Sequence, residues 1–337
     1  MTKTECSALR CIAIISIVLH NYAHCLPGSA QENEFTFSQD NFVYFLQSFF
    51  DTSIIIQLFS FFGHLGVPVF VFLTGYGLAQ KYDSIEQIDW KHFLYNHWKK
   101  LFIPIVIGTF TYLIVMFVLE GQLVCSISRA IVQCSMLLNI ISPTHLLPLP
   151  YWYFGLTMQF YVIYLLFIHK HSIKPILLLT IVSIAFTVCF PQYIKISKFN
   201  CIGWLPSLFL GIAYSRYLNY LPKKNLYYIC ALCISILLIV LASYNYYSWL
   251  LIPILVVFAA IGIAKSMPIS FQQKVDSIGK NSLLLFVIHP IIRELILPFN
   301  YVLGNYASWC IYLIATIATV YIFLYIRNHF YSFSHLK

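Results

Sequence analysis

The chain has 337 residues, of which 60% are hydrophobic and only 9% charged, with a formal net charge of +9 at pH 7. So apolar a composition excludes a soluble domain of this length and predicts a polytopic membrane protein. The excess positive charge does not indicate a nucleic-acid partner. The basic residues lie in short loops between apolar runs, where the positive-inside rule accounts for them.

Long apolar runs containing glycine and proline, without the short alternating pattern of barrel strands, predict an all-α bundle of transmembrane helices. About ten such runs follow one another with no domain boundary, so we expect a single membrane domain over residues 1–337. The predicted spans lie near residues 8–25, 64–80, 101–119, 151–169, 175–190, 203–217, 226–243, 249–265, 281–297 and 307–326.

The basic residues orient this bundle. With ten spans, both termini are expected in the cytoplasm, together with all of the twenty Lys and Arg residues except Arg129, Lys195, Lys198 and Arg293. Two further apolar stretches, residues 41–62 and 124–141, contain several polar side chains. If only one of these stretches crossed the membrane, the basic loops that follow it would lie on the outer side instead of the cytoplasmic side. We therefore expect both to be interfacial or re-entrant segments on the outer face.

The first span carries Arg10 near one end and His20 and His24 near the other. At about 1.5 Å rise per residue, Arg10 and His20 stand roughly 15 Å apart, so one is expected near a membrane surface and the other at depth. Ionisable groups at depth usually face a bundle interior or a watery cavity, which makes them functional candidates. The alternative is a signal anchor whose histidines snorkel to the outer interface. No convincing cleavage site follows, so we expect the helix to be retained.

The next polar residues lie beside the second and third spans. His64 precedes a segment of small residues that ends at Lys81, and close helix packing explains those glycines as well as function does. Lys99 and Lys100 open the third span from inside. They are candidates for a topology signal, a lipid headgroup contact or a site for a phosphorylated cofactor.

Aromatic and ionisable residues mark two later spans. Trp152 and Gln159 lie in the fourth, where the aromatic rings suit either an interfacial belt or stacking on a sugar. His289, Arg293 and Glu294 lie within the ninth. Arg293 and Glu294 could reduce each other's free-energy cost of placing a charge in the membrane. Alternatively, each has a separate partner, because adjacent helical residues point about 100° apart.

Motifs for other chemistries are missing from the sequence. The ten cysteines show no metal-binding spacing, and there is no HExxH, no GxSxG and no phosphate-cradling glycine loop. We therefore expect no metal site and no permanently bound cofactor.

Taken in order, these blocks resemble the acyltransferase-3 family, integral membrane enzymes of bacteria that O-acylate surface polysaccharides, lipopolysaccharide and peptidoglycan. The matching pieces are Leu9-Arg10 with His20-Asn21-Tyr22, residues 66–76, Lys99-Lys100-Leu101 before Pro104, residues 152–159, Phe209 and Gly211 before Arg216, and residues 279–282 before His289-Pro290. The chain departs from the family pattern at two positions. Nine residues rather than ten separate Arg10 from His20, and Gln159 stands where a Glu is common.

The resemblance implies transfer of an acyl group, expected to be acetyl, from acyl-CoA to a hydroxyl of a cell-surface glycan or glycolipid in the bacterial cytoplasmic membrane. His20 would act as the base with Arg10 as a second catalytic residue, or His20 would share the basic role with His24. The residues implied for CoA are Arg10, Lys81, Lys99, Lys100 and Tyr76. Those implied for the acceptor and for the developing oxyanion are Asn21, His24, His64, Trp152, Gln159, His289 and Arg293.

Two questions stay open at this point. Direct transfer and a route through an acyl-histidine are both compatible with the residues. A carrier or flippase for a lipid-linked glycan is the competing function, although no internal repeat and no pair of matched broken helices supports it. A third possible function is a noncatalytic partner of an export complex, and no feature of the sequence supports it.

Overall fold

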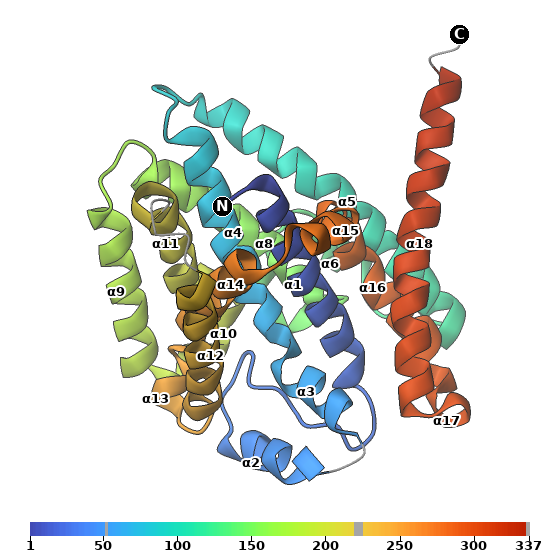
Figure 1. Ribbon diagram of the computed structural model, residues 1–337. Coiled ribbons are helices and arrows are strands. Elements are labelled where there is room, and N and C mark those ends of the chain that lie inside the picture. Colours follow the sequence, from blue (N-terminus) through green and yellow to red (C-terminus); the bar gives the residue numbers. More distant parts are fainter. Residues whose placement is uncertain (51–52, 219–224, 335–337) are drawn as a thin grey trace.

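The computed structural model describes residues 1–50, 53–218 and 225–334. Across these residues the chain is helical and contains no strand, so the all-α prediction is confirmed. Figure 1 shows a bundle in which the N-terminus and the end of α18 lie toward the same end, whereas α2 and α3 lie at the other. Two of the lysines that we assigned to the cytoplasmic side, Lys223 and Lys224, and the C-terminal Lys337 lie outside the described residues.

Within the described residues, seven helices are long and apolar enough to cross a membrane. They are α1 (Lys3–Ala23), the α3–η2–α4 unit (Ile54–Tyr82), α5 (Trp90–Glu120), η4–α8–η5 (Leu149–Ile168), α12 (Asn225–Ala242), α16–η9–α17 (Ser282–Leu303) and the Asn305–Arg327 part of α18 (Asn305–Ser334). An eighth crossing is α9 (Lys174–Cys189) together with Pro191–Phe199, if this pair, bent by 105°, counts as one span.

The two remaining predicted spans form shorter helices. Residues 203–217 are represented by α11 (Leu205–Ala213) and a π-helical turn at Tyr214–Leu218, and residues 249–265 by α14 (Ile252–Ser266). The remaining short helices are α2 (Gln39–Gln47), α6 (Ile127–Cys134), α7 (Leu138–Ile141), α10 (Ile194–Phe199), α13 (Tyr246–Trp249) and α15 (Ile269–Lys280). The multi-pass class is thus established, while ten spans and cytoplasmic termini remain predictions.

The stretch 41–62 does not behave as one interfacial segment. Its first part forms α2, but Ile54–Phe62 forms α3 and continues through a single 3-10 turn into α4 (Gly66–Tyr82). The second span therefore begins at Ile54 rather than at residue 64. The stretch 124–141 forms α6 and α7, each too short to cross a membrane.

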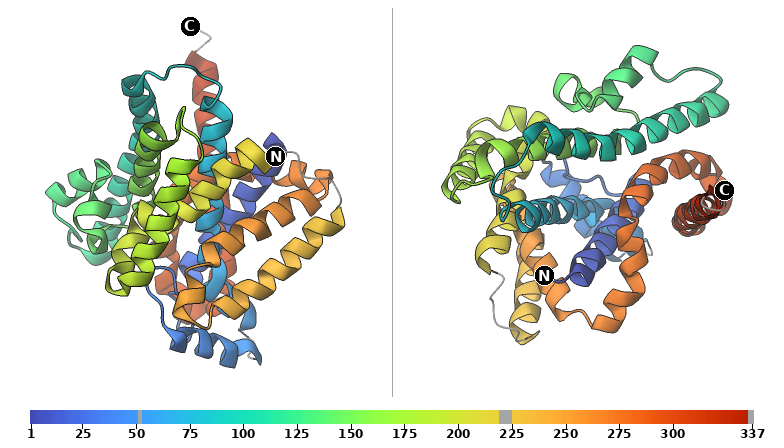
Figure 2. Two further views of the ribbon diagram at one scale, coloured as in Figure 1. Left: turned by 90° about the vertical axis from the view of Figure 1, so that its left-hand side faces the viewer. Right: turned by 90° about the horizontal axis from the view of Figure 1, so that it is seen from above.

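Helix α1 lies at the centre of the bundle, where it contacts α3, α4, α14, α15, α16 and α18 (Figure 2). A capping box begins it: the Thr2 hydroxyl accepts from the Glu5 amide at 3.0 Å, and the Glu5 carboxylate accepts from the Thr2 amide at 2.7 Å. Lys265 at the end of α14 contacts the same carboxylate at 3.0 Å. The start of α1 is thus fixed to a neighbouring helix.

Two glycines bring the second span against α1. A Cβ at Gly66 would lie 2.4 Å from the Ala13 carbonyl oxygen, and one at Gly63 would lie 2.5 Å from the Cβ of His20. The absence of side chains at both positions lets the backbones approach closely. His64, which lies between these glycines, is thereby held beside His20.

The loop after α1 folds back under the end of the bundle. Its Ala30 is bonded through both backbone groups: the amide donates to Gln57 at 2.7 Å, and the carbonyl accepts from the Ser60 hydroxyl at 2.5 Å. Further along, the Trp249 indole donates to the Asn33 carbonyl at 2.8 Å. These bonds hold the acidic part of the loop over the end of α1.

Candidate active site

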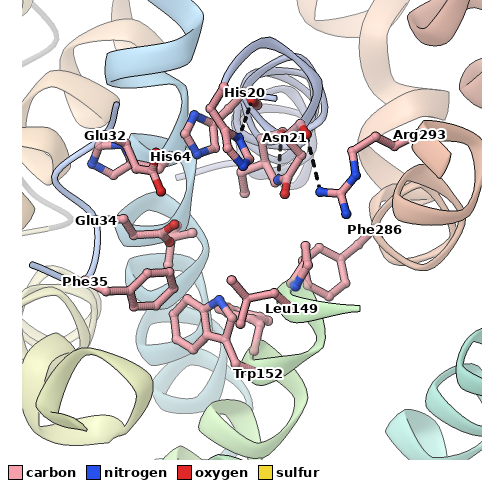
Figure 3. A pocket seen from close by; sticks show the side chains of 15 residues that line it. His20, Asn21, Glu32, Glu34, Phe35, His64, Leu149, Trp152, Phe286 and Arg293 are labelled. Atoms are coloured by element: carbon pink, nitrogen blue, oxygen red, sulfur yellow. Dashed lines mark hydrogen bonds between the residues drawn. The ribbon is translucent and has the colours of Figure 1, made fainter. Parts of the chain in front are cut away.

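A cavity of about 60 Å³ with several ionisable side chains in its wall lies at the end of α1, beside the folded-back loop (Figure 3). Its walls come from α1, the loop, η2 (Gly63–Leu65), α4, η4 (Leu149–Tyr151), α8 (Trp152–Ile163) and α16 (Ser282–Ile296). Its lining consists of Ile17, His20, Asn21, His24, Glu32, Glu34, Phe35, His64, Val67, Leu149, Pro150, Trp152, Tyr153, Phe286 and Arg293. Of the residues predicted from sequence, the structure brings together His20, Asn21, His24, His64, Trp152 and Arg293.

His20 is buried, and its ring has a defined orientation. Its Nδ1 lies 3.1 Å from the Phe59 carbonyl oxygen. Because a carbonyl can only accept, this geometry assigns the proton of the neutral imidazole to Nδ1 and leaves a lone pair on Nε2. The arrangement suits a base, because its reactive nitrogen is not used in the bond that orients the ring.

His24 lies one helical turn beyond His20 on the same face of α1. Its Nδ1 bonds the His20 carbonyl at 2.9 Å, and the two rings stack with centroids 4.9 Å apart. The Cys25 thiol lies 3.6 Å from its Nε2. Both histidines are therefore oriented through Nδ1 by main-chain carbonyl groups.

Two more ionisable groups in this cavity carry a buried atom without a partner. The ring of His64 meets that of His20 edge-on, with centroids 5.5 Å apart, and its Nδ1 is buried and unbonded. In the loop, one carboxylate oxygen of Glu32 is also buried and unbonded. Burial and the nearby Glu32 raise the pKa of Glu34, the next carboxyl of the loop, to about 8. Such unsatisfied polar groups are typical of a site that receives a ligand.

Arg293 reaches the cavity from α16. It forms an ion pair with Glu294 at 2.6 Å, and one of its terminal nitrogens donates to the Asn21 carbonyl at 3.4 Å. The two neighbours thus pair with each other, and Arg293 also contacts α1. The Asn21 side chain donates to the Ile17 carbonyl at 2.9 Å, which leaves its amide oxygen as an acceptor.

Aromatic rings form the opposite side of the cavity. Phe35 stacks on Phe199 at 4.2 Å and meets Trp152 edge-on at 5.4 Å. Trp152 in turn stacks on Trp204 at 5.7 Å. Because this wall is built of stacked, buried rings, it offers a rigid apolar surface next to the histidines.

A second cavity, of about 300 Å³, lies toward the other end of α1. Basic side chains gather there, since Arg10, Lys81, Lys100 and His97 all line it. It continues into a further cavity of about 490 Å³, where Arg10 and Lys81 recur beside Tyr76 and Lys280. The Tyr76 hydroxyl is bonded to the first residue, donating to the Met1 carbonyl at 2.9 Å.

An apolar cavity of about 170 Å³ lies between the basic cavity and the histidine cavity. It shares the wall residues Arg10 and Thr74 with the basic cavity, and Tyr153 and Phe286 with the histidine cavity. The three cavities are therefore neighbours in a row along α1, from Arg10 to His20.

Three predicted site residues lie away from this row. Lys99 is exposed and does not line the cavity that Lys100 lines. Gln159 ties α8 to the α10–α11 connection, because its amide donates to Asn200 and accepts from the Cys201 amide, both at 2.8 Å. His289 is fully buried within α16, with its Nδ1 on the Leu285 carbonyl.

The structure also adds residues that the sequence reasoning did not assign to the site. Glu32, Glu34 and Phe35 belong to the loop that follows α1, and Tyr153 belongs to the aromatic block of residues 152–159. The only sequence signal for these loop residues was weak, since Glu32 and Glu34 follow closely after the helix that carries His20 and His24. Their position depends on the bonds that fold the loop back.

Helices that cross the membrane several times and enclose a polar cavity lined by histidines define a multi-pass membrane protein with an internal site. A family model described as an acyltransferase domain, acyltransferase 3, matches residues 6–327. The chain therefore belongs to the acyltransferase-3 family, as the resemblance predicted, and is a membrane acyltransferase. A comparison with the curated proteins found no match, and neither did a comparison with the solved structures.

Proposed function

We propose that this protein transfers an acyl group, acetyl in the simplest case, from acyl-CoA to a hydroxyl of a cell-surface glycan or glycolipid in the bacterial cytoplasmic membrane. The observation that carries the proposal is the row of neighbouring cavities along α1. A basic chamber lies at one end of the row and a histidine chamber at the other, and the apolar cavity between them shares wall residues with both.

The basic chamber suits the phosphorylated end of CoA. Arg10, Lys81 and Lys100 supply three cationic side chains around one cavity. Guanidinium and ammonium groups are the usual protein partners of phosphate oxygens. The apolar cavity beyond them suits the uncharged arm of the donor, whose thioester would then reach the histidines.

The histidine chamber suits attack by a hydroxyl. The Nε2 of His20 takes the acceptor proton as the acceptor oxygen bonds to the acyl carbon, and the same proton then passes to the departing thiolate as the C–S bond breaks. Arg293 and His64 are the nearest candidates to stabilise the oxyanion that forms in between. An acyl-histidine route would use the same Nε2 lone pair as nucleophile.

The acceptor would occupy the side under the loop. Phe35, Trp152 and Tyr153 provide aromatic surface there, and Glu32 and Glu34 provide hydrogen-bond acceptors. Aromatic surface beside carboxylates is suited to the face and the hydroxyls of a sugar ring.

The direct test is to follow a labelled acyl group. Membranes from cells that produce the protein, supplied with acetyl-CoA labelled in the acetyl group, should transfer label to the surface-glycan fraction, and mild alkali should release it because the product is an ester. Membranes that contain the His20→Ala variant serve as the control. Label that appears only in protein or in lipid without sugar, or that resists alkali, would contradict the proposed acceptor class.

Neighbouring lysines provide a matched test of the basic chamber. Lys100 lines the cavity and Lys99 does not, so Lys100→Ala should raise the apparent KM for acyl-CoA by up to about fivefold, as expected for an exposed charge contact. The difference should shrink in high salt, because exposed charges are screened over about 8 Å at physiological ionic strength. Steady-state kinetics on purified protein would measure it. Equal effects of Lys99→Ala and Lys100→Ala would speak against a CoA site in this cavity.

A further inference from the structure

Three groups that can act as hydrogen-bond acceptors or metal ligands converge in the histidine chamber. His20, His24 and Glu32 each offer one ligand atom, and these atoms lie within 4.8 Å of one another. Both histidines use Nδ1 on a main-chain carbonyl, which leaves Nε2 as the ligand nitrogen of each ring; the Nε2 of His24 also lies 3.6 Å from the Cys25 thiol, a contact that metal binding would replace. One oxygen of Glu32 is buried without a partner. Acceptors that face one another are stable only when something electron-poor lies between them.

We propose that a divalent transition-metal ion of the Zn²⁺ type binds to His20, His24 and Glu32. Two imidazole nitrogens and one carboxylate form a ligand set typical of zinc sites that keep a fourth position open. The carbonyl groups that hold each Nδ1 are the outer partners that orient metal-binding histidines. The residues that create the site are thus two histidines four apart on α1 and a glutamate that the folded-back loop supplies.

The geometry needs only a small adjustment. In a tetrahedral zinc site with ligand distances of about 2.0–2.1 Å, ligand atoms lie about 3.3 Å apart, so the three groups must approach one another by roughly 1.5 Å at most. Glu32 belongs to an irregular loop, and its side chain can supply this movement. The backbone bonds of the two histidines can remain in place.

Binding there has a consequence that rests on the proposed function. The metal takes the Nε2 lone pair that His20 needs to accept the proton of the acceptor hydroxyl. Protein with metal at this site is therefore inactive in acyl transfer. The metal acts as an inhibitor that competes with the acceptor proton for the Nε2 lone pair of His20. The same lone pair therefore has two uses that exclude each other.

Direct binding of zinc to purified protein tests the site without any activity measurement. The background is a Cys230→Ser/Cys233→Ser variant, because two exposed thiols three residues apart could bind zinc themselves. In competition with a chromogenic chelator, this protein should take up one equivalent of Zn²⁺ tightly. Glu32→Gln, which preserves shape, and His24→Ala should each weaken the binding by about tenfold or more.

Matched controls come from exposed residues outside the cavity. His145→Ala and Glu86→Gln should leave zinc affinity unchanged. Bound Co²⁺ should give the absorption of a tetrahedral nitrogen and oxygen ligand set, without thiolate charge-transfer bands. Absence of tight binding, or equal affinity in Glu32→Gln, His24→Ala and the controls, would overturn the site. It would mean that protons alone satisfy the three acceptors.

A second arm separates this inference from the proposed function. Added Zn²⁺ should stop acyl transfer from acyl-CoA and a chelator should restore it, while Glu32→Gln should need at least about tenfold more zinc for the same inhibition. Full transfer by protein with zinc bound at this site would overturn the inhibitory role. The protein could also bind zinc as expected and yet show no acyl transfer before zinc is added. That result would count against the acyl-transfer proposal and would leave the metal site intact.

Discussion

His20→Ala should lower kcat for acyl transfer by about 10²–10⁴-fold in protein that is still inserted and monodisperse, because removal of a general base typically costs this much. The Phe59 carbonyl orients the ring so that Nε2 is available for the acceptor proton. Alanine removes that nitrogen, but the helix keeps its main-chain bonds. Single-turnover kinetics with labelled acyl-CoA would measure the effect on the chemical step.

The contrast with His24→Ala makes the assignment specific. His24 lies nearer the end of α1, bonded to the His20 carbonyl, and should act mainly on the KM for the acceptor. If His20→Ala retains near-normal transfer and His24→Ala is inactive, the base is His24. If neither substitution affects transfer, the catalytic interpretation of the first helix is wrong.

Gly66→Ala should lower the free energy of unfolding by about 1–3 kcal/mol, the usual cost of forcing extra volume into a packed contact. The new Cβ would lie 2.4 Å from the Ala13 carbonyl oxygen, so the second span must move away from α1. His64 would move with it and leave the ring of His20. Thermal unfolding in detergent, monitored by size-exclusion chromatography, would show the loss.

A second glycine of α4 is the matched control. Nothing lies within 4 Å of a Cβ at Gly77. Gly77→Ala should leave stability unchanged or raise it slightly, because alanine favours a helix over glycine by roughly 0.5–1 kcal/mol. Equal destabilisation by the two substitutions would show that the close contact with α1 does not determine the effect.

The helical membrane class could be predicted from the sequence because burial in lipid imposes long apolar runs. The start of the second span could not. Gln57, one of the polar residues of the stretch 41–62, suggested an interfacial segment, but its side chain and that of Ser60 are buried and bond the loop residue Ala30. Their partners come from the folded-back chain, and hydropathy along the sequence contains no information about them.

The candidate site was predictable to the extent that it uses ionisable residues inside apolar helices. His20, His24, His64 and Arg293 were identified for this reason, and the structure gathers them into one cavity. Their catalytic and binding roles remain predictions. Glu32 could not be chosen in this way, because carboxylates are ordinary in an outer loop and only tertiary contacts bring this one to the histidines.

The separation of the two chambers determines which donors the protein can use. Arg10 and His20 are ten positions apart on one helix, about 15 Å by rise, and the apolar cavity, which Arg10 and Ile17 both line, lies along the stretch between them. The helix is a molecular ruler: within the proposed function, it accepts a donor whose charged anchor and reactive carbonyl are joined by a long, uncharged arm. A compact donor such as acetyl phosphate would reach only one of the two ends, so its charge could not help to position its acyl group.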